Sequence, residues 1–330
     1  MEERISLIRG LFFIVKMEKY LSEVLSILNE LKRVNNISFL NKGYSQEKKY
    51  ILTTEEGIKY LLRLSFPKDP HMKFIEMEKM LECIKLGVKC NEPIRFGLTS
   101  DKECFYSLLS WIEGDDGLKS LKNIPKSNHL KIGIVAGKQL RLINSIPDKT
   151  NSNTWYDRYV KKQKLYYEIF KQSSINFPNQ SEIIKFINEN LNLIKNRPSY
   201  FQHDDFHLSN IIINNNTYAG VIDFNRWDYG DPWHEFVKLY MFSSEISRNF
   251  CIGQVRGYFN NKPIPKDFFN ITALYTAFTI ISALVWCKKL VPYEYNQMQN
   301  RVKRIIEEFN RFNLNKPDWL DTKKVGLEKF

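Results

Sequence analysis

Acidic, amide and imidazole side chains are concentrated in one short stretch of this chain, residues 201–231. Within it, Asp205 is followed by four residues and then by Asn210, and Asp223 comes a little further on. Carboxylate and amide oxygens are the hard ligands that Mg²⁺ takes in phosphate sites, and phosphoryl transfer needs a further acceptor to orient the attacking hydroxyl. These residue types point to magnesium-assisted phosphoryl transfer.

Two short strands must position these groups. The apolar run that follows Asn210 leads through a polar turn, Asn214–Thr217, into a second strand, Tyr218–Ile222, which ends just before Asp223. A hairpin with a tight turn brings the residue before its first strand close to the residue after its second strand. We therefore expect Asn210 and Asp223 to lie side by side as metal ligands, with Asp205 in the loop beneath them.

The same stretch is open to a different metal chemistry. His203, Asp204, Asp205 and His207 are of the types that hold the metal pair of a hydrolase. The other histidines of the chain lie in dissimilar contexts and supply no second cluster. A metal-dependent hydrolase is therefore kept as a less favoured alternative.

The spacing also matches the catalytic signature of protein kinases, H-x-D-x-x-x-x-N, with His203, Asp205 and Asn210 in register. The segments HDDFHLSN, VIDF and YGDP occur in the order of the H-G-D-x-H-x-x-N, I-D-x and G-D-P motifs of the aminoglycoside phosphotransferase family. The chain resembles that family from residue 17 to about residue 315. The resemblance implies a bilobal, protein-kinase-like α+β fold, with a small antiparallel β-rich N-lobe and a larger, mostly helical C-lobe.

The activity that the resemblance implies is a small-molecule kinase. Such an enzyme moves the γ-phosphoryl group of ATP or GTP, with Mg²⁺, to a hydroxyl of an aminoglycoside or of another amino alcohol or sugar. Asp205 would be the catalytic base or hydroxyl-orienting residue, His203 would brace the loop, and Asn210 and Asp223 would hold the metal. Asp204 stands where the family has Gly, a departure that removes no magnesium ligand. A catalytically weak, nucleotide-binding regulatory protein of the same fold is the second alternative.

The resemblance also assigns nucleotide contacts in the N-terminal part. Gly43 and Ser45 lie in a turn that corresponds to the nucleotide loop, where Gly allows close approach of the backbone. The hinge that would bind adenine is expected near Trp111 and Ile112.

One cation is expected to hold the α- and β-phosphates. Arg63, on the third strand, occupies the position where the family has Lys, and a guanidinium can clamp phosphate bidentately. Glu78, in the following helix, is expected to pair with this cation, with Glu76 as the alternate.

Periodicity and turn residues divide the chain into a short extension, residues 1–16, a nucleotide-binding N-lobe, residues 17–112, and a catalytic, acceptor-binding C-lobe, residues 113–330. The strand-like runs of the N-lobe are Ile37–Leu40, Lys49–Thr53, Lys59–Leu64, Pro93–Leu98 and Cys104–Ile112. The helical patterns of the C-lobe are His129–Ser145, Trp155–Phe170, Glu182–Leu193, Trp233–Ser243, Phe268–Leu290 and Tyr293–Phe312.

Composition excludes several classes of protein. Of the 330 residues 43% are apolar and 26% charged, which is ordinary for a globular chain. The net charge is +12, but the basic residues are spread along helices, so we expect no nucleic-acid partner. The five cysteines form no CxxC pair, which favours a reducing cytoplasm. No apolar run reaches the roughly 18 residues of a membrane span, and a monomer or weak dimer is expected.

The acceptor is harder to predict. Residues 201–247 contain seven acidic and two basic side chains, a local negative patch that would steer a cationic acceptor. Trp227, Asp228, Asp231 and Glu235 are the candidate acceptor-binding residues. Asp231 precedes Pro232, and this pair is also typical of a helix N-cap and first turn.

Overall fold

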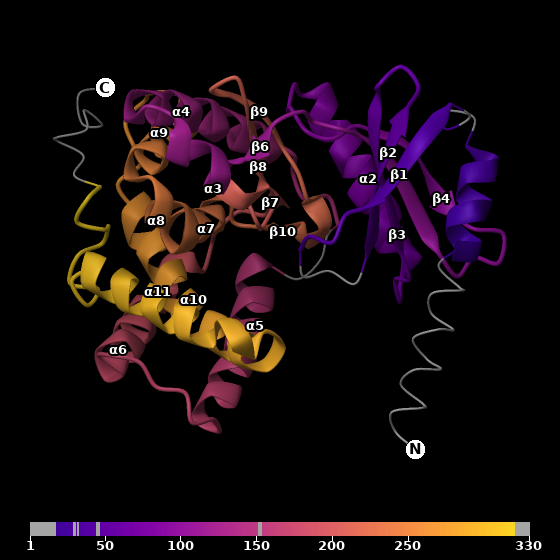
Figure 1. Ribbon diagram of the computed structural model, residues 1–330. Helices are drawn as coiled ribbons and strands as arrows, with labels where there is room; N and C mark the ends of the chain where they lie inside the picture. The colour runs from indigo at the N-terminus through magenta and orange to yellow at the C-terminus, as the bar shows by residue number, and fades with distance from the viewer. Residues whose placement is uncertain (1–17, 29–30, 32, 44–46, 151–153, 321–330) are drawn as a thin grey trace. The chain divides into compact units, whose positions relative to one another are not determined.

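The computed structural model describes residues 18–28, 31, 33–43, 47–150 and 154–320 (Figure 1). The predicted extension, residues 1–16, lies outside them. The chain divides into two compact units. The first holds the described residues up to Lys85 together with Cys90–Ile112, and the second holds Leu86–Lys89 and the described residues from Glu113 onward.

The first unit contains an antiparallel sheet of five strands in the order β1-β2-β3-β5-β4. The strands are β1 (Val34–Phe39), β2 (Lys48–Thr54), β3 (Lys59–Ser65), β4 (Pro93–Leu98) and β5 (Phe105–Ser110). Residues 18–27 are helical, and Val24 of this helix and Leu28, which follows it, are buried in a core with Leu52, Leu62 and Leu108 of the sheet. The remaining helix, α2 (Pro70–Lys85), packs the Phe74 ring 5.1 Å from that of Phe105.

The second unit is mostly helical and holds two small sheets. Its α-helices are α3 (Gly117–Ser120), α4 (Lys126–Ile143), α5 (Trp155–Lys171), α6 (Gln180–Asn190), α7 (Phe236–Lys238), α8 (Ser244–Ile246), α9 (Arg248–Tyr258), α10 (Phe268–Leu290) and α11 (Tyr295–Glu308). Its strands are β6 (Asp115–Asp116), β7 (Tyr200–Gln202), β8 (Ile211–Asn214), β9 (Thr217–Val221) and β10 (Asp228–Gly230). The strands of the antiparallel pairs β7–β10 and β8–β9 lie within residues 200–230, the part of the chain that carries the acidic and amide side chains noted above.

The predicted helix over Trp233–Ser243 is present but irregular. A 3₁₀ turn, Pro232–Glu235, leads into α7, and a π-helical turn, Leu239–Ser243, follows before α8. Short departures of this kind from α-helical geometry are frequent at functional sites. Periodicity alone does not indicate such changes of pitch.

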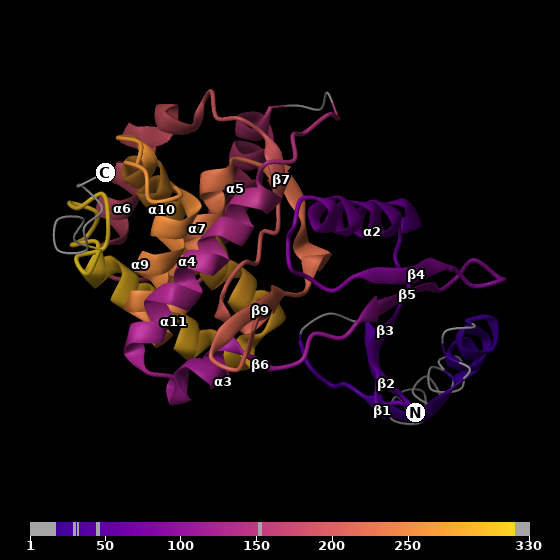
Figure 2. The same ribbon diagram turned by 90° about the horizontal axis from the view of Figure 1, so that it is seen from above.

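Helix α9 was not predicted, because two glycines lower its intrinsic helix propensity. In the structure these glycines allow α4 and α9 to approach closely, and Figure 2 shows the two helices side by side. A Cβ atom on Gly137 of α4 would lie 2.0 Å from the carbonyl oxygen of Gln254, and one on Gly257 of α9 would lie 2.0 Å from that of Ile134. The two helices can therefore pack this closely only because these positions have no side chain.

Helix α10 corrects one expectation. It is long and apolar enough, with 23 residues, to cross a membrane by length and composition. Most of it is instead buried in the second unit, where Ile280, Ile281 and Leu284 are at most 4% exposed. Its apolar character on all sides is that of a core helix.

The contact of α4 with α9 leads to a stability prediction. Gly137→Ala should lower the free energy of unfolding by about 1–3 kcal/mol or more, because a methyl group has no space against the backbone of α9. Val135→Ala, at an exposed position of α4, is the control and should change stability by less than about 0.5 kcal/mol. Chemical denaturation measures both, and equal effects would contradict this account of the packing.

Candidate active site

The hairpin β8–β9 places the predicted metal ligands as its geometry requires. Ile211 pairs with Val221, and the N–H of Ile222 donates to the carbonyl oxygen of Asn210 at 2.9 Å. Asn210 and Asp223 therefore flank the open end of the hairpin. Asp223 has a φ of 70°, in the left-handed region, which Asp tolerates better than most residues.

Asp205 is joined directly to Asn210. The Asn210 amide Nδ2 donates to the backbone oxygen of Asp205 at 3.0 Å and to its Oδ2 at 3.2 Å. Asn210 is 9% exposed, whereas the Asp205 side chain is 21% exposed. The Asp205 carboxylate is thus partly exposed to solvent, and the amide nitrogen of Asn210 holds it in place.

His203 is buried, and both of its ring nitrogens are engaged by the backbone. Nδ1 accepts the N–H of Asp205 at 3.2 Å, and Nε2 lies 3.0 Å from the carbonyl oxygen of Ile222, to which it donates. Burial lowers the pKa of His203, which favours the neutral ring that this pattern needs. The histidine therefore ties the loop before Asp205 to the end of β9.

The hydrolase alternative does not agree with this arrangement. A neutral His203 with both nitrogens used by the backbone has no lone pair for a metal. Within the part of the chain that the structure describes, no three His, Cys, Asp or Glu side chains are grouped to hold a metal ion.

Three basic side chains lie near the Asp205 carboxylate. Lys238 Nζ lies 3.1 Å from Oδ1, His207 Nε2 lies 3.4 Å from the same oxygen, and Arg226 Nε lies 3.9 Å from Oδ2. Burial opposes ionisation, but Lys238, His207 and Arg226 together hold the pKa of Asp205 well below its usual value. The contact of Lys238 was not predicted, because only the tertiary fold brings this residue of α7 to Asp205.

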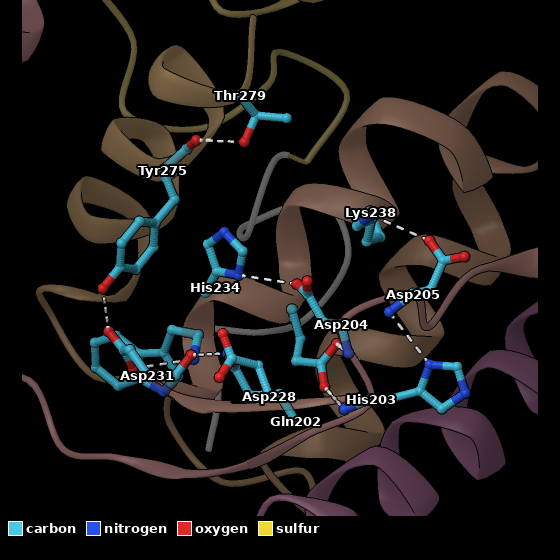
Figure 3. A network of polar contacts seen from close by, with 12 residues as sticks. Gln202, His203, Asp204, Asp205, Asp228, Asp231, His234, Lys238, Tyr275 and Thr279 are labelled. Carbon is cyan, nitrogen blue, oxygen red and sulfur yellow. Dashed lines mark hydrogen bonds and ion pairs between the residues drawn. The ribbon is translucent and has the colours of Figure 1, made fainter. Parts of the chain in front are cut away.

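Asp231 does not meet the expectation that it contacts an acceptor. Its side chain is 0% exposed and accepts from Arg197 Nε at 2.6 Å and from the Trp233 N–H at 3.1 Å. It also accepts from the Tyr275 hydroxyl at 2.9 Å (Figure 3). The N-cap prediction is confirmed, because the Trp233 contact caps the turn that begins at Pro232. A carboxylate that is fully enclosed by these donors is structural.

Glu235 is likewise wrong as an acceptor-binding residue. It is 0% exposed, and its two oxygens accept the backbone N–H groups of His203, at 2.6 Å, and of Asp204, at 3.1 Å. Burial and the nearby Asp204 carboxylate raise the pKa of Glu235 to about 8. Glu235 holds the loop and does not reach solvent.

The other two candidate acceptor residues lie at the surface of the second unit. Trp227 is half-buried, with its ring 5.9 Å from the rings of Phe201 and Tyr229. Asp228 is half-buried at the start of β10, and burial, reinforced by the Asp204 charge, raises the pKa of Asp228.

In the first unit, Arg63 belongs to a buried ion-pair network. Its guanidinium contacts Glu76 at 2.9 Å and Glu47 at 2.7 Å, and Lys73 Nζ lies 2.6 Å from Glu47 and 2.8 Å from Glu76. Glu78, the first choice as partner of Arg63, is wrong, because it lies on the exposed face of α2, while Glu76 is 1% exposed. Glu47 and Lys73 were not predicted.

The remaining nucleotide candidates are placed only in part. Gly43 has a φ of +96°, a conformation that side chains other than Gly rarely adopt. Ser45 lies outside the described residues. Trp111 and Ile112 directly follow β5 and are half-buried.

The buried Glu235 generates a prediction of pH dependence. The unfolded chain releases this proton above a pH of about 4.5, but the folded protein keeps it up to a pH of about 8. Relative to Glu235→Gln, the wild type should therefore lose stability between pH 5 and pH 8, by up to about 1.4 kcal/mol per pH unit. Denaturant titrations of both proteins across that range measure the slope, and a difference independent of pH would contradict it.

Comparisons with known proteins agree with this geometry. The model of the phosphotransferase enzyme family matches residues 36–268. Comparison with curated proteins gives no match.

Solved structures share the fold at low sequence identity. Aminoglycoside phosphotransferase APH(4)-Ia has a TM-score of 0.62 at 16% identity, covering 89% of this chain and 98% of that one. The GDP complex of wild-type aminoglycoside 2'-phosphotransferase-IIIa has a TM-score of 0.60 at 14% identity, covering 89% and 98%. The streptomycin–ATP–APH(2")-IIa ternary complex has a TM-score of 0.57 at 18% identity, covering 84% and 95%.

The family match covers more than half of the chain, and the structural matches extend over most of it. Both the resemblance and the predicted fold class are confirmed. The chain belongs to the phosphotransferase enzyme family and has the bilobal, protein-kinase-like α+β fold of the aminoglycoside phosphotransferases.

Proposed function

We propose that this protein is a small-molecule kinase that transfers the γ-phosphoryl group of ATP or GTP to a hydroxyl group. The observation that carries the proposal is the open end of the β8–β9 hairpin, where Asn210 and Asp223 flank the strands and Asp205 bonds to Asn210. One oxygen ligand from an amide, one from a carboxylate and one carboxylate for the acceptor hydroxyl are the parts that phosphoryl transfer requires.

The residues at the hairpin fit a magnesium ion. Asn210 uses its amide nitrogen on Asp205, so its amide oxygen is the atom that faces a metal, and Asp223 supplies a carboxylate. When bound, Mg²⁺ would neutralise charge on the donor's phosphates. His203 braces the loop that carries Asp205 and is assigned no chemical step.

We assign to Asp205 the orientation of the acceptor hydroxyl. A carboxyl whose pKa lies well below the usual value is ionised at any working pH, and it is a weak proton acceptor for the same reason. Accepting a hydrogen bond from the hydroxyl aims its oxygen at the phosphorus, and this positioning is the main catalytic contribution in such transfers.

The nucleotide contacts are proposed from the first unit. Arg63, held by Glu47 and Glu76, is the phosphate-binding cation, Gly43 and Ser45 form the nucleotide loop, and Trp111 and Ile112 contact the base. Residues 17–112 then act as the nucleotide-binding lobe, and residues 113–330 as the catalytic lobe. Solved relatives in complex with GDP and with ATP support a nucleoside triphosphate as donor.

The cysteines bear on the setting of the enzyme. The five cysteines form no disulfide, as expected of a protein in a reducing cytoplasm. We propose a cytoplasmic monomer or weak dimer whose partners are a nucleotide and a small-molecule hydroxyl acceptor, without nucleic acid or membrane.

Replacing the orienting carboxylate tests the proposed reaction. Asp205→Asn should lower the rate of acceptor-dependent ADP or GDP release by roughly two to four powers of ten, because the hydroxyl loses its ionic acceptor. Nucleotide affinity, measured by titration calorimetry, should stay within about threefold of the wild type. Asp267→Asn, an exposed aspartate of the second unit, is the control. Turnover by Asp205→Asn at the wild-type rate would exclude the assigned role.

The metal assignment is tested separately. Asn210→Ala and Asp223→Asn each remove one oxygen ligand, so each should raise the Mg²⁺ concentration for half-maximal rate by about tenfold or more. The measurement is a magnesium titration of nucleoside diphosphate release at saturating nucleotide. An unchanged midpoint in both variants would show that the metal binds elsewhere.

A further inference from the structure

Tyr159 of α5 has a hydroxyl group that the fold does not use. The residue is 2% exposed, and its ring lies 4.9 Å from Trp155, 5.3 Å from His234 and 5.2 Å from Tyr275. The hydroxyl has no hydrogen-bond partner among the described residues. A buried polar atom left in this state is unfavourable, and in native proteins it usually has a reason.

Two more buried polar atoms meet at the same place. Asp204 Oδ1 lies 3.3 Å from His234 Nδ1, without the alignment of a hydrogen bond, and neither atom has another partner in the described chain (Figure 3). Burial, with the Asp204 charge, raises the pKa of Tyr159 well above its usual value, so the phenol keeps its proton. Asp204 directly precedes Asp205, so this cluster adjoins the residue proposed to orient the reacting hydroxyl.

The cluster offers both kinds of hydrogen-bonding atom. Asp204 Oδ1 only accepts, whereas the Tyr159 hydroxyl can donate and accept. An ammonium group only donates and leaves the Tyr159 proton without an acceptor. A hydroxyl group can donate to Asp204 and accept from Tyr159 at the same time, and so it matches the set better.

Charges in the second unit also oppose the cationic acceptor that the count of acidic residues predicted. Asp231 is paired with Arg197, and Glu235 accepts backbone N–H groups. Glu245 is paired with Arg301 at 2.8 Å. These three carboxylates therefore add nothing to an acidic surface.

Cations also act on the carboxylates that remain near the cluster. Burial raises the pKa of Asp204, but His234, Lys238 and Lys162 lower it. Arg158 and Lys162 oppose the rise that burial causes in the pKa of Asp228. Arg158 and Lys162 are four residues apart on α5, so they share one face of that helix. A ligand with several positive charges would meet these cations as well as the carboxylates.

We propose that Asp204, Tyr159 and His234 form a subsite for a second, non-reacting hydroxyl of the acceptor, and that the acceptor is an uncharged, sugar-like polyol. The inference rests on the proposed kinase function and adds the class of its acceptor. The acceptor is then held at two neighbouring points, one hydroxyl at Asp205 and one at the Tyr159–Asp204 pair.

The test is a steady-state comparison of neutral and cationic acceptors. The release of the nucleoside diphosphate, ADP or GDP, is the readout. The probes are a series of pentoses, hexoses and cyclitols against gentamicin and streptomycin. We expect at least one neutral polyol to exceed both cationic compounds in kcat/KM by about tenfold or more. A higher kcat/KM for either cationic compound, or no turnover of any polyol by a protein that still hydrolyses its nucleotide, would overturn the inference. Loss of all nucleotide turnover would instead refute the proposed kinase.

Tyr159→Phe tests the subsite itself with the best polyol. It should raise the KM for that acceptor by tenfold or more and leave the KM for nucleotide unchanged. Since the hydroxyl has no partner in the fold, this variant should keep the wild-type melting temperature, which a structural hydroxyl would not allow. Tyr218→Phe, another buried tyrosine of the second unit, is the matched control and should change neither constant. An unaltered acceptor KM in Tyr159→Phe would exclude the subsite.

Discussion

Two fully buried carboxyl groups, Asp231 and Glu235, determine the conformation of the loop on which the proposed chemistry depends. A carboxyl group removed from water, whether charged or protonated, is tolerated only when hydrogen-bond partners surround it. Arg197, Tyr275 and a backbone N–H surround Asp231, and the N–H groups of the loop itself serve Glu235. The loop must therefore take the path that brings these N–H groups to Glu235, and that path leaves Asp205 at the surface.

Two residues of this segment have backbone conformations that are normally unfavourable. Asp204 and Asp223 both have positive φ values, 53° and 70°, in the left-handed region. Each is unfavourable by roughly 1–3 kcal/mol unless the surroundings impose it. At Asp204 the bond to Glu235 does so, and the contacts of His203 with the loop and with β9 hold the two ends of the hairpin segment together. The unfavourable backbone conformations and the hydrogen bonds that stabilise them thus lie within one small group of residues.

The sequence predicted what depends on local spacing. The hairpin, the placement of Asn210 and Asp223 at its open end, and most long amphipathic helices follow from turn residues and periodicity. Lys238 and Tyr159 were not predicted to lie near this stretch, because tertiary packing alone brings Lys238 to Asp205 and Tyr159 to His234, and no spacing rule links these pairs. Helix α9 was not predicted because its glycines lower helix propensity. Their structural reason is the close contact with the backbone of α4, which the sequence pattern does not reveal.

The buried network around Arg63 limits how this position can change during evolution. Its guanidinium forms ion pairs with two carboxylates, Glu47 and Glu76, and Lys73 contacts the same two carboxylates. A lysine at position 63 has a single nitrogen and cannot reproduce the forked contact, so one buried carboxylate would lose a partner. In an Arg63→Lys protein, Lys73 would be left as the nearest cation of one of these carboxylates, so changes at positions 63 and 47 are energetically coupled.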